Sequence, residues 1–301
     1  LDQFSIDRLL PADPRAHTHA VSSFGTYFYN FNCNPRLADG RENPFADARV
    51  RRAFAMCMDK QSIADEIRRL GEPVASTLIP PGSIGGYTSP RGLKNISDAT
   101  TQDERQAIID EAKALLKEAN YPQDFVVTLS FNKDSGHDLI GQAIAKSWQK
   151  HLGIQTSLSQ KELKIFRDDL KDHQFMTARA GWFGDYGDPT TFLDINQSED
   201  GNNDRAYNNP VYDDLLRRAG LELDTEKRMA LLSEAERIIV QEDLPLIPIF
   251  HYATIYMFDP HKITGLSTHP RTKQDVFLID VLDDDLGPNE PRPMRHAEVS
   301  P

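Results

Sequence analysis

A strand–helix–strand succession in the middle of the chain restricts the fold more than any other feature. The stretch FVVTLSF at 125–131 is typical of a strand, 139–151 has the spacing of an amphipathic helix, and IQTSLS at 154–159 is typical of a second strand. Two strands joined by a helical crossover lie parallel in one sheet. The sequence therefore predicts an α/β fold.

Further elements follow from the alternating or helical spacing of apolar residues. The clearest strand is TYFYNFNC at 26–33, in which Tyr27, Tyr29 and Phe31 share one side. Residues 1–25 are expected to be irregular or short extended structure with a loop at 13–19, and 71–93 a long surface loop rich in Pro and Gly. The other predicted elements are helices beginning at Asp47, Asp59 and Thr101 (with Glu104 completing a capping box), helices at 162–171, 211–219 and 225–242, and strands at 245–258 and 276–281.

The stretch TARAGWFGDYGDPTTFL at 177–193 brings unusual chemistry together. Residues 174–180 alternate as in a short strand, and the glycines that follow, at 181, 184 and 187, are expected to end it. Asp188-Pro189 predicts a turn that opens a helix at Thr190. The loop leaving this strand carries Trp182, Phe183, Asp185 and Tyr186, and such loops bind ligands in open α/β sheets.

An indole beside a carboxylate on this loop suits a ligand with an apolar body and a cationic group. A peptide with a free amino terminus is such a ligand. The residues alone leave another interpretation open, in which Trp182 packs in the core and Asp185 caps a turn.

Charge and hydropathy exclude several function classes. The chain has 34 Lys and Arg against 46 Asp and Glu, so its formal charge of -12 argues against nucleic acid and anionic membrane surfaces as partners. No run approaches about 18 apolar residues, and Leu1 begins without a basic, apolar leader, so we expect neither a membrane span nor an export signal within this chain. At 301 residues and 39% hydrophobic content, the chain can bury a real core.

No catalytic, metal or cofactor motif emerges. The sequence lacks G-x-S-x-G, H-E-x-x-H and G-x-x-x-x-G-K, and Asp185 with His137 would be an acid and a base without a nucleophile. A calcium loop beginning at Asp194 fails because Glu199 stands where glycine is required and Arg205 where the closing glutamate belongs. Cys33 and Cys57 are explained as two buried thiols, or as a disulfide if the protein is exported. His17 and His19 could ligate a metal, but without a third ligand nearby a solvated loop is the preferred interpretation.

Several segments resemble one known family in order and spacing. The stretch at 178–193 is similar to the ARAGW-x-x-DY-x-(D/E)-PT-x-FL signature of the extracytoplasmic oligopeptide-binding proteins, the peptide-type (family 5) receptors of ABC importers. The resemblance continues in PFADARVRRAFAMCMDKQSI at 44–63, DEAKALLKEANY at 110–121, FNKDSGHDLIGQAIAKSWQKHLGI at 131–154 and AYNNPVYDDLL at 206–216. It covers nearly all of 26–255.

The resemblance implies a periplasmic-binding-protein-like (type II) fold, with a mixed sheet flanked by helices. This chain would be the carboxy-terminal lobe of a two-lobed clamp. Residues 26–255 would form the ligand-binding lobe, 1–25 a remnant of the first lobe and hinge, 256–285 the return hinge with first-lobe strands, and 286–301 a disordered tail.

The resemblance also implies a site. The ligand would be a short extended peptide held by its backbone, with Asp185 pairing with its amino terminus, Gly181 and Phe183 offering backbone groups, and Trp182 forming a wall. Arg179 would either reach the cleft or hold the loop through a salt bridge. The other positions that match the family's cleft are Asn132 and His137 near the ligand's carboxyl end, Asn202 in DGNND, and Tyr252 in PIFHYA.

Three positions depart from the family pattern. Asn30 stands where an acid is frequent, Leu163 where a pocket tryptophan is found, and Leu170 where an arginine for the peptide carboxylate is found. The implied function is the substrate-binding component of an ABC importer: monomeric, outside the cytoplasmic membrane, without cofactor or catalysis, and delivering peptides to a membrane permease. The alternatives are a non-peptide solute such as an oligosaccharide or a nickel chelate, and a hydrolase.

Overall fold

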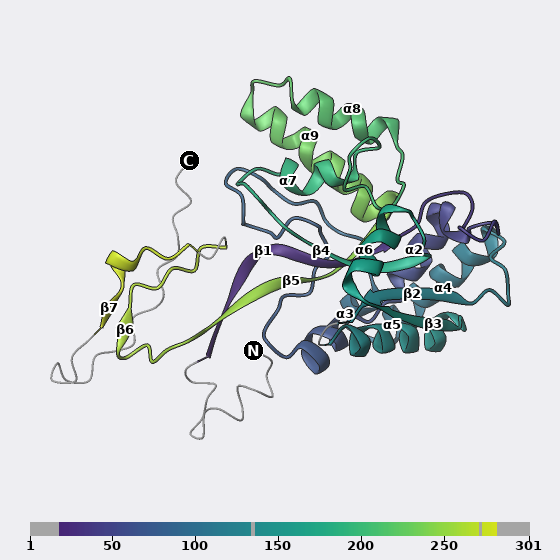
Figure 1. The fold of residues 1–301 in the computed structure, drawn as a ribbon, viewed down its shortest axis with the longest axis horizontal. Coiled ribbons are helices and arrows are strands. Elements are labelled where there is room, and N and C mark those ends of the chain that lie inside the picture. Colours follow the sequence, from purple (N-terminus) through teal and green to yellow (C-terminus); the bar gives the residue numbers. More distant parts are fainter. Residues whose placement is uncertain (1–17, 134–135, 271–272, 282–301) are drawn as a thin grey trace.

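The centre of the protein is a mixed five-stranded sheet in the order β3-β2-β4-β1-β5 (Figure 1). The computed structural model describes residues 18–133, 136–270 and 273–281. The strands are β1 (Thr18–Phe31), β2 (Val127–Asn132), β3 (Thr156–Lys161), β4 (Thr177–Phe183) and β5 (Leu246–Met257). β2 runs parallel to β3 and β4, whereas β1 runs antiparallel to β4 and β5. The expected mixed α/β architecture is confirmed.

The strand–helix–strand unit predicted from the sequence is present as β2, α5 (His137–Leu152) and β3. α5 approaches β2 closely at Gly141, where an added Cβ would lie 3.1 Å from the ring of Phe131. The helix ends at Gly153, whose φ of +76° is the left-handed conformation that glycine adopts at low cost.

Helices cover both faces of the sheet. The α5 face is covered by α2 (Ala48–Met56), α4 (Gln102–Glu118) and α5, whose apolar residues pack with Tyr27, Phe31, Leu129 and Phe250 in one core. The α9 face is covered by α7 (Thr190–Leu193), α8 (Pro210–Ala219) and α9 (Thr225–Arg237), which pack with Phe24 and Phe28 in a second core. In Figure 1, α7, α8 and α9 lie above the sheet and α4 and α5 at its lower right.

Shorter elements complete the chain. α3 (Lys60–Ser62) runs into a π-helix, Ile63–Arg68, and α6 (Leu163–Lys171) lies between β3 and β4. The remaining elements are short 3-10 helices at Pro44–Ala46, Ile96–Asp98, Asp194–Asn196 and Val276–Leu278, a π-helix at Ile238–Glu242 that follows α9, and the strands β6 (Ile263–Thr264) and β7 (Asp280–Val281).

The helix caps predicted from the sequence are largely present. Asp47 accepts a hydrogen bond from the amide of Arg49, and Thr101 accepts one from the amide of Glu104. The capping box is only half formed, because the Glu104 carboxylate accepts from Thr100 rather than from Thr101.

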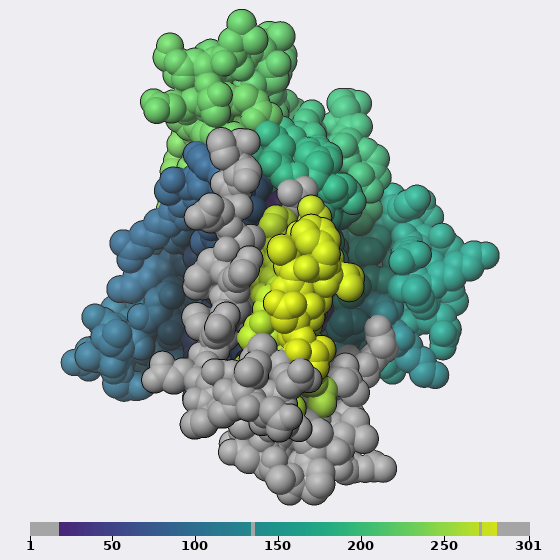
Figure 2. Space-filling model, turned by 90° about the vertical axis from the view of Figure 1, so that its left-hand side faces the viewer, coloured from purple at the N-terminus to yellow at the C-terminus, as the bar shows by residue number. Residues whose placement is uncertain are grey.

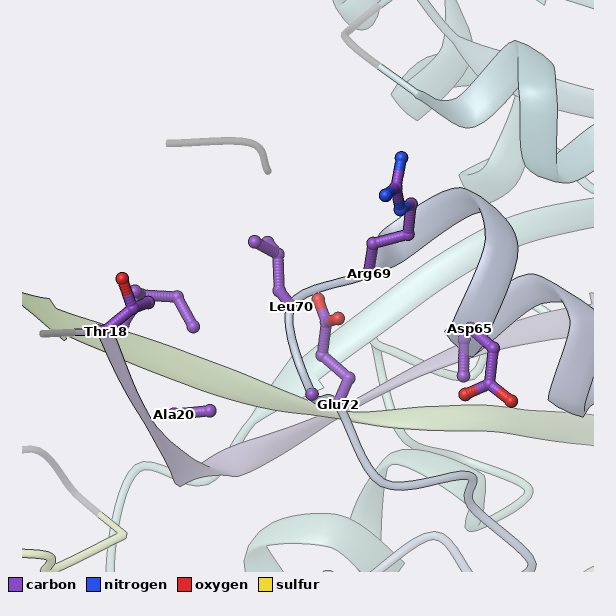
Figure 3. Close-up of a pocket in the computed structure, with 9 residues that line it drawn as sticks. Thr18, Ala20, Asp65, Arg69, Leu70 and Glu72 are labelled. Carbon is purple, nitrogen blue, oxygen red and sulfur yellow. The ribbon is translucent and has the colours of Figure 1, made fainter. Parts of the chain in front are cut away.

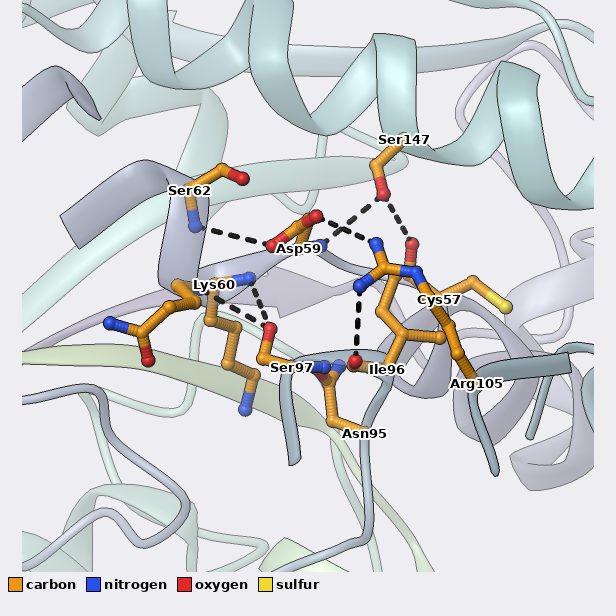
Figure 4. A network of polar contacts seen from close by, with 10 residues as sticks. Cys57, Asp59, Lys60, Ser62, Asn95, Ile96, Ser97, Arg105 and Ser147 are labelled. Carbon is orange, nitrogen blue, oxygen red and sulfur yellow. Dashed lines mark hydrogen bonds and ion pairs between the residues drawn. The ribbon is translucent and has the colours of Figure 1, made fainter. Parts of the chain in front are cut away.

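The cap residue Asp59 also joins the helices α3, α4 and α5 on the α5 face (Figure 4). Its carboxylate accepts from the amide of Ser62 and from the Arg105 guanidinium of α4, the latter at 2.8 Å. The Ser147 hydroxyl of α5 accepts from the Asp59 amide and donates to the Cys57 carbonyl. This network fixes how α3, α4 and α5 pack together.

Both cysteines are free thiols. Cys57 is buried and Cys33 is partly exposed.

Three predictions about the secondary structure are wrong. β1 begins at Thr18, inside the loop predicted at 13–19, because residues 18–22 pair with 253–257 of β5. β4 continues through Gly181 to Phe183, because Gly181 and Phe183 are still paired with β1. In the predicted strand 276–281, Val276–Leu278 is a 3-10 helix, and only Asp280–Val281 pairs, with β6.

The segment 71–93 is irregular, as expected, but it does not lie only on the surface. Ala75, Leu78 and Ile79 are fully buried, and the Ala75 amide donates to the Ile249 carbonyl of β5. The segment therefore covers the outer edge of β5.

β6 and β7 form a separate two-stranded sheet beyond the ends of β1 and β5 (Figure 1). Figure 2 views the protein from this side, with this carboxy-terminal segment in yellow and the helices of the α9 face in green above it. The expected domain boundaries at 25 and 255 both fall inside continuous strands. The expected tail at 286–301, and His17 of the histidine pair, lie outside the described residues.

Candidate functional site

The hydrogen-bond pattern between β1 and β4 determines which backbone groups of β4 are not bonded to β1. The amide of Gly184 donates to the carbonyl of Phe24 at 2.8 Å, and the amide of Asn32 donates to the carbonyl of Met176 at 2.9 Å. In an antiparallel ladder, the backbone amide and carbonyl groups of one residue bond to the neighbouring strand, and those of the next residue point to the opposite edge. The even-numbered residues of β4 therefore bond to β1, whereas the backbone groups of Gly181 and Phe183 point to the opposite edge.

That opposite edge is unpaired beyond Ala178. β2 pairs with β4 only at Thr177 and Ala178, and then continues beside β3 as far as Asn132. Among the described residues no backbone partner is present for the amide or carbonyl groups of Gly181 and Phe183. We call this segment, Gly181–Phe183, the open edge of β4. An unpaired edge is a template for a further strand.

Arg179, Gly181 and Phe183 lie on the α5 face, because side chains alternate along a strand. The guanidinium carbon of Arg179 lies 5.6 Å from the ring centroid of Tyr27, within cation–π range. Its Nε is buried and has no hydrogen-bond partner among the described residues. Arg179 is in no salt bridge of the described part, so the expected alternative of a loop-holding ion pair has no support here.

Two aromatic rings stack over β1, on the side of β4 away from the open edge. Phe183 stacks on Tyr252 of β5 with a centroid distance of 4.5 Å and an interplanar angle of 17°, although 57% of Phe183 is exposed. The Tyr252 hydroxyl reaches across to Gly181, where an added Cβ would lie 2.5 Å from its oxygen. The structure thus brings together Gly181, Phe183 and Tyr252 from the predicted set.

His137 and Asn132 lie at the carboxyl end of β2, where β2 and β4 diverge. His137 is the first residue of α5, and its Nδ1 lies 3.1 Å from the hydroxyl of Tyr27. Burial raises the pKa of Tyr27 above its usual range, so this hydroxyl stays neutral. The Asn132 side chain is buried, and its Oδ1 has no hydrogen-bond partner in the described part.

Asp185 follows the open edge on an exposed turn. Its amide donates to the Thr191 hydroxyl at 2.9 Å, whereas its carboxylate makes no ion pair or hydrogen bond with the described residues. The turn itself is held by Asp188, whose two carboxylate oxygens accept from Arg228 of α9 at 2.7 and 2.9 Å. Partial burial opposes ionisation of Asp188, but the hydrogen bonds from Arg228 and Thr190 outweigh it and lower the pKa of Asp188.

The structure separates two predicted residues from this group. Trp182 lies on the α9 face, half-buried against the core of that face, so it does not form a wall with Gly181 and Phe183. Asn202 lies in an exposed turn and its carbonyl accepts from Arg205, a fully buried residue that also donates to Asn30 of β1. Asn202 is therefore linked to the α9 face and not to the α5-face residues.

Sequence reasoning missed two residues of β1 that lie next to β4 on the α5 face. Tyr27 contacts both Arg179 and His137, and Gly25 lies under the Phe183 ring. The alternation of β1 places Tyr27 correctly on one side of its strand, but its partners on β4 follow only from the register. Of the departures from the family pattern, Leu163 is exposed at the start of α6 and Leu170 is buried with Phe166.

A cavity of about 450 Å³ lies elsewhere, between the start of β1 and the end of the π-helix (Figure 3). Its lining includes Thr18, Ala20, Asp65, Arg69 and Glu72. The Glu72 side chain is buried and its Oε1 pairs with Arg68 at 2.6 Å. None of the open-edge residues lines this cavity, so the two features are separate.

The chain is similar to known proteins in sequence and in fold. The sequence model of the bacterial extracellular solute-binding proteins, family 5 (middle region), matches residues 5–204. The periplasmic murein peptide-binding protein MppA of Escherichia coli is 34% identical over 250 residues, which cover 82% of this chain and 44% of MppA. A probable deoxycholate-binding periplasmic protein of the same organism is 33% identical over 271 residues, 88% of this chain and 46% of the relative.

A solved structure is similar as well. The unliganded open form of MppA, a periplasmic murein tripeptide-binding protein, superposes with a TM-score of 0.79 and 29% identity, over 92% of this chain and 51% of that protein. The chain thus spans about half the length of the curated relatives it matches. No helix in the described part of the chain has the length and apolarity needed to cross a membrane. On the family match and these relatives, the chain belongs to the bacterial extracellular solute-binding proteins of family 5, a family of binding proteins.

Proposed function

We propose that this chain is the carboxy-terminal ligand-binding lobe of a substrate-binding protein that captures short peptides for an ABC importer. The observation that carries the proposal is the open edge of β4, where the backbone groups of Gly181 and Phe183 have no partner among the described residues. An extended peptide added to such an edge gains main-chain hydrogen bonds that do not depend on its sequence.

The charges at the two ends of the open edge give the ligand a direction. Asp185, with an unpaired carboxylate, follows the carboxyl end of β4 and suits the ammonium group of a peptide. Arg179, with a buried unpartnered Nε, precedes the open edge and suits a carboxylate or a carbonyl. The peptide then runs antiparallel to β4, with its amino terminus at Asp185 and its carboxyl end toward Arg179 and Asn132.

The names of the relatives support peptides as the ligand class, because MppA is described as binding murein peptides. The deoxycholate relative keeps a non-peptide solute as the second candidate. The open edge favours the peptide, because the amide and carbonyl groups of Gly181 and Phe183 can pair with a peptide backbone but not with a ligand that has few polar groups.

We infer the wider role from membership of the family. Residues 26–255 form the lobe proposed here, and 1–25 and 256–285 lead to the first lobe, with which it closes by hinge motion. The protein works as a monomer outside the cytoplasmic membrane, hands its ligand to a membrane permease and catalyses no reaction.

The test is a calorimetric titration of the natural full-length protein with Ala-Ala-Ala and with its amino-terminally acetylated form. Acetylation removes the ammonium group, so we expect it to weaken binding about tenfold or more. In Asp185→Asn this penalty falls to about twofold, whereas Asp65→Asn, an exposed acid at the separate cavity, keeps it. Equal affinities for the two peptides in the unmodified protein would contradict the direction, and no binding of either would contradict the proposed function.

A further inference from the structure

The Phe183 ring is exposed yet fixed in position. It stacks on Tyr252 at 4.5 Å, and 57% of the residue remains open to solvent. A large apolar side chain held rigid and exposed has a surface ready to bury a ligand group without an ordering cost.

Two glycines make room for this pair of rings. A Cβ at Gly25 would lie 2.5 Å from Cδ1 of Phe183, and a Cβ at Gly181 would lie 2.5 Å from the Tyr252 hydroxyl. Each ring therefore packs directly against the backbone of a neighbouring strand. Phe183 is held by Gly25 on one strand and by Tyr252 on another, which leaves few alternative positions for it.

Strand geometry identifies the ligand residue that meets this ring. Residues opposite each other in an antiparallel pair project to the same face, with Cβ atoms about 4.5–5.5 Å apart. A ligand residue opposite Phe183 therefore places its side chain on the α5 face. The Phe183 ring leans over Gly25 of β1, away from the open edge, so only a side chain long enough to reach across β4 meets the exposed ring. Because Asp185 lies only two positions beyond Phe183, that ligand residue is the amino-terminal one.

We propose that the Phe183–Tyr252 stack makes this site selective for peptides whose amino-terminal residue is aromatic. This inference rests on the proposed function, since it needs a peptide paired antiparallel to the open edge. Aromatic side chains stack on one another with a gain beyond that of burial alone. Arg179 lies on the α5 face of β4 two positions before Gly181, toward the other end of the ligand.

The experiment compares Phe-Ala-Ala, Ala-Ala-Phe and Ala-Ala-Ala by calorimetric titration of the natural full-length protein. Phe-Ala-Ala is expected to bind about tenfold more tightly than Ala-Ala-Ala, and more tightly than Ala-Ala-Phe. In Phe183→Ala, and in the more conservative Phe183→Leu, the ratio of the first two affinities is expected to fall to about twofold or less. Ratios are used because they cancel any general effect of a substitution on binding.

The outcomes separate this inference from the proposed function. Binding of Ala-Ala-Ala without a preference for Phe-Ala-Ala would overturn the aromatic selectivity and leave the peptide receptor intact. A preference that persists in both Phe183 variants would overturn the role of the stack. Failure of all three peptides to bind would overturn the proposed function and this inference with it.

Discussion

The amide nitrogen of Gly184 donates a hydrogen bond of 2.8 Å to the carbonyl oxygen of Phe24. This bond fixes the phase of the β1–β4 ladder, so that Gly181 and Phe183 turn their backbone groups away from β1. A phase shifted by one residue would present Ala180 and Trp182 instead and would move Arg179 and Phe183 to the other face. The relation between Gly184 and Phe24 therefore defines the site.

Gly181→Ala is expected to destabilise the fold by about 1–2 kcal/mol, because the new methyl group would lie 2.5 Å from the Tyr252 hydroxyl. Tyr252→Phe removes that oxygen, and the next ring atom stands at an ordinary contact distance of 3.4 Å. The double variant is thus expected to recover most of the loss. Urea unfolding of the two single variants and the double variant measures this. Additive effects would show that the two side chains do not meet.

Asp188→Asn is expected to cost about 1–3 kcal/mol, because it breaks a two-bond pair with Arg228 that is largely shielded from solvent. The same change is expected to weaken peptide binding, since Asp188 holds the turn that carries Asp185. Asp214→Asn is the matched control, because its ion pairs with Arg217 and Arg218 are exposed and worth about 0–1 kcal/mol. Equal losses in the two variants would contradict the role of Asp188.

Much of the fold is predictable because its signals are local. The parallel unit at 125–159 and the caps at Asp47 and Thr101 depend on periodicity and on short-range hydrogen bonds. Non-local pairing is different. Residues 18–25 carry weak strand signals, and the pairing with β5 and β4 makes them extended.

The site was predictable only in part, for the same reason. The residues at 179–185 stand out in the sequence, but their assignment to faces depends on the ladder. The glycine at 181 was expected to end a strand, whereas it continues β4 and leaves space for Tyr252. Tyr27 could not be identified as a partner of Arg179 and His137, since these residues meet only through tertiary packing.

Burial on the α9 face predicts a pH effect on stability. Burial raises the pKa of Glu236 to about 7, although hydrogen bonds from the Ile79 amide and the Tyr87 hydroxyl oppose the shift. As the pH rises from 4.5, the unfolded carboxyl loses its proton first, so this residue's contribution to stability falls until the folded carboxyl ionises near pH 7. The loss is of the order of 3 kcal/mol.

Glu236→Gln removes this titration while keeping a group that can bond to both partners. The difference in unfolding free energy between the variant and the parent is expected to increase in favour of the variant from pH 4.5 to 7. Taking the difference cancels other groups, such as His251, whose pKa burial lowers to about 4. A difference that stays constant over this range would show that the carboxyl titrates normally.

The most direct test of the open edge is amide hydrogen exchange, measured by NMR on the natural full-length protein with and without a bound tripeptide. A paired strand protects the amides to which it bonds, so the exchange of Gly181 and Phe183 is expected to slow at least tenfold on binding. Leu223, which is 96% exposed between α8 and α9, serves as the reference and is expected not to change. Binding of the peptide without protection of Gly181 and Phe183 would contradict the account.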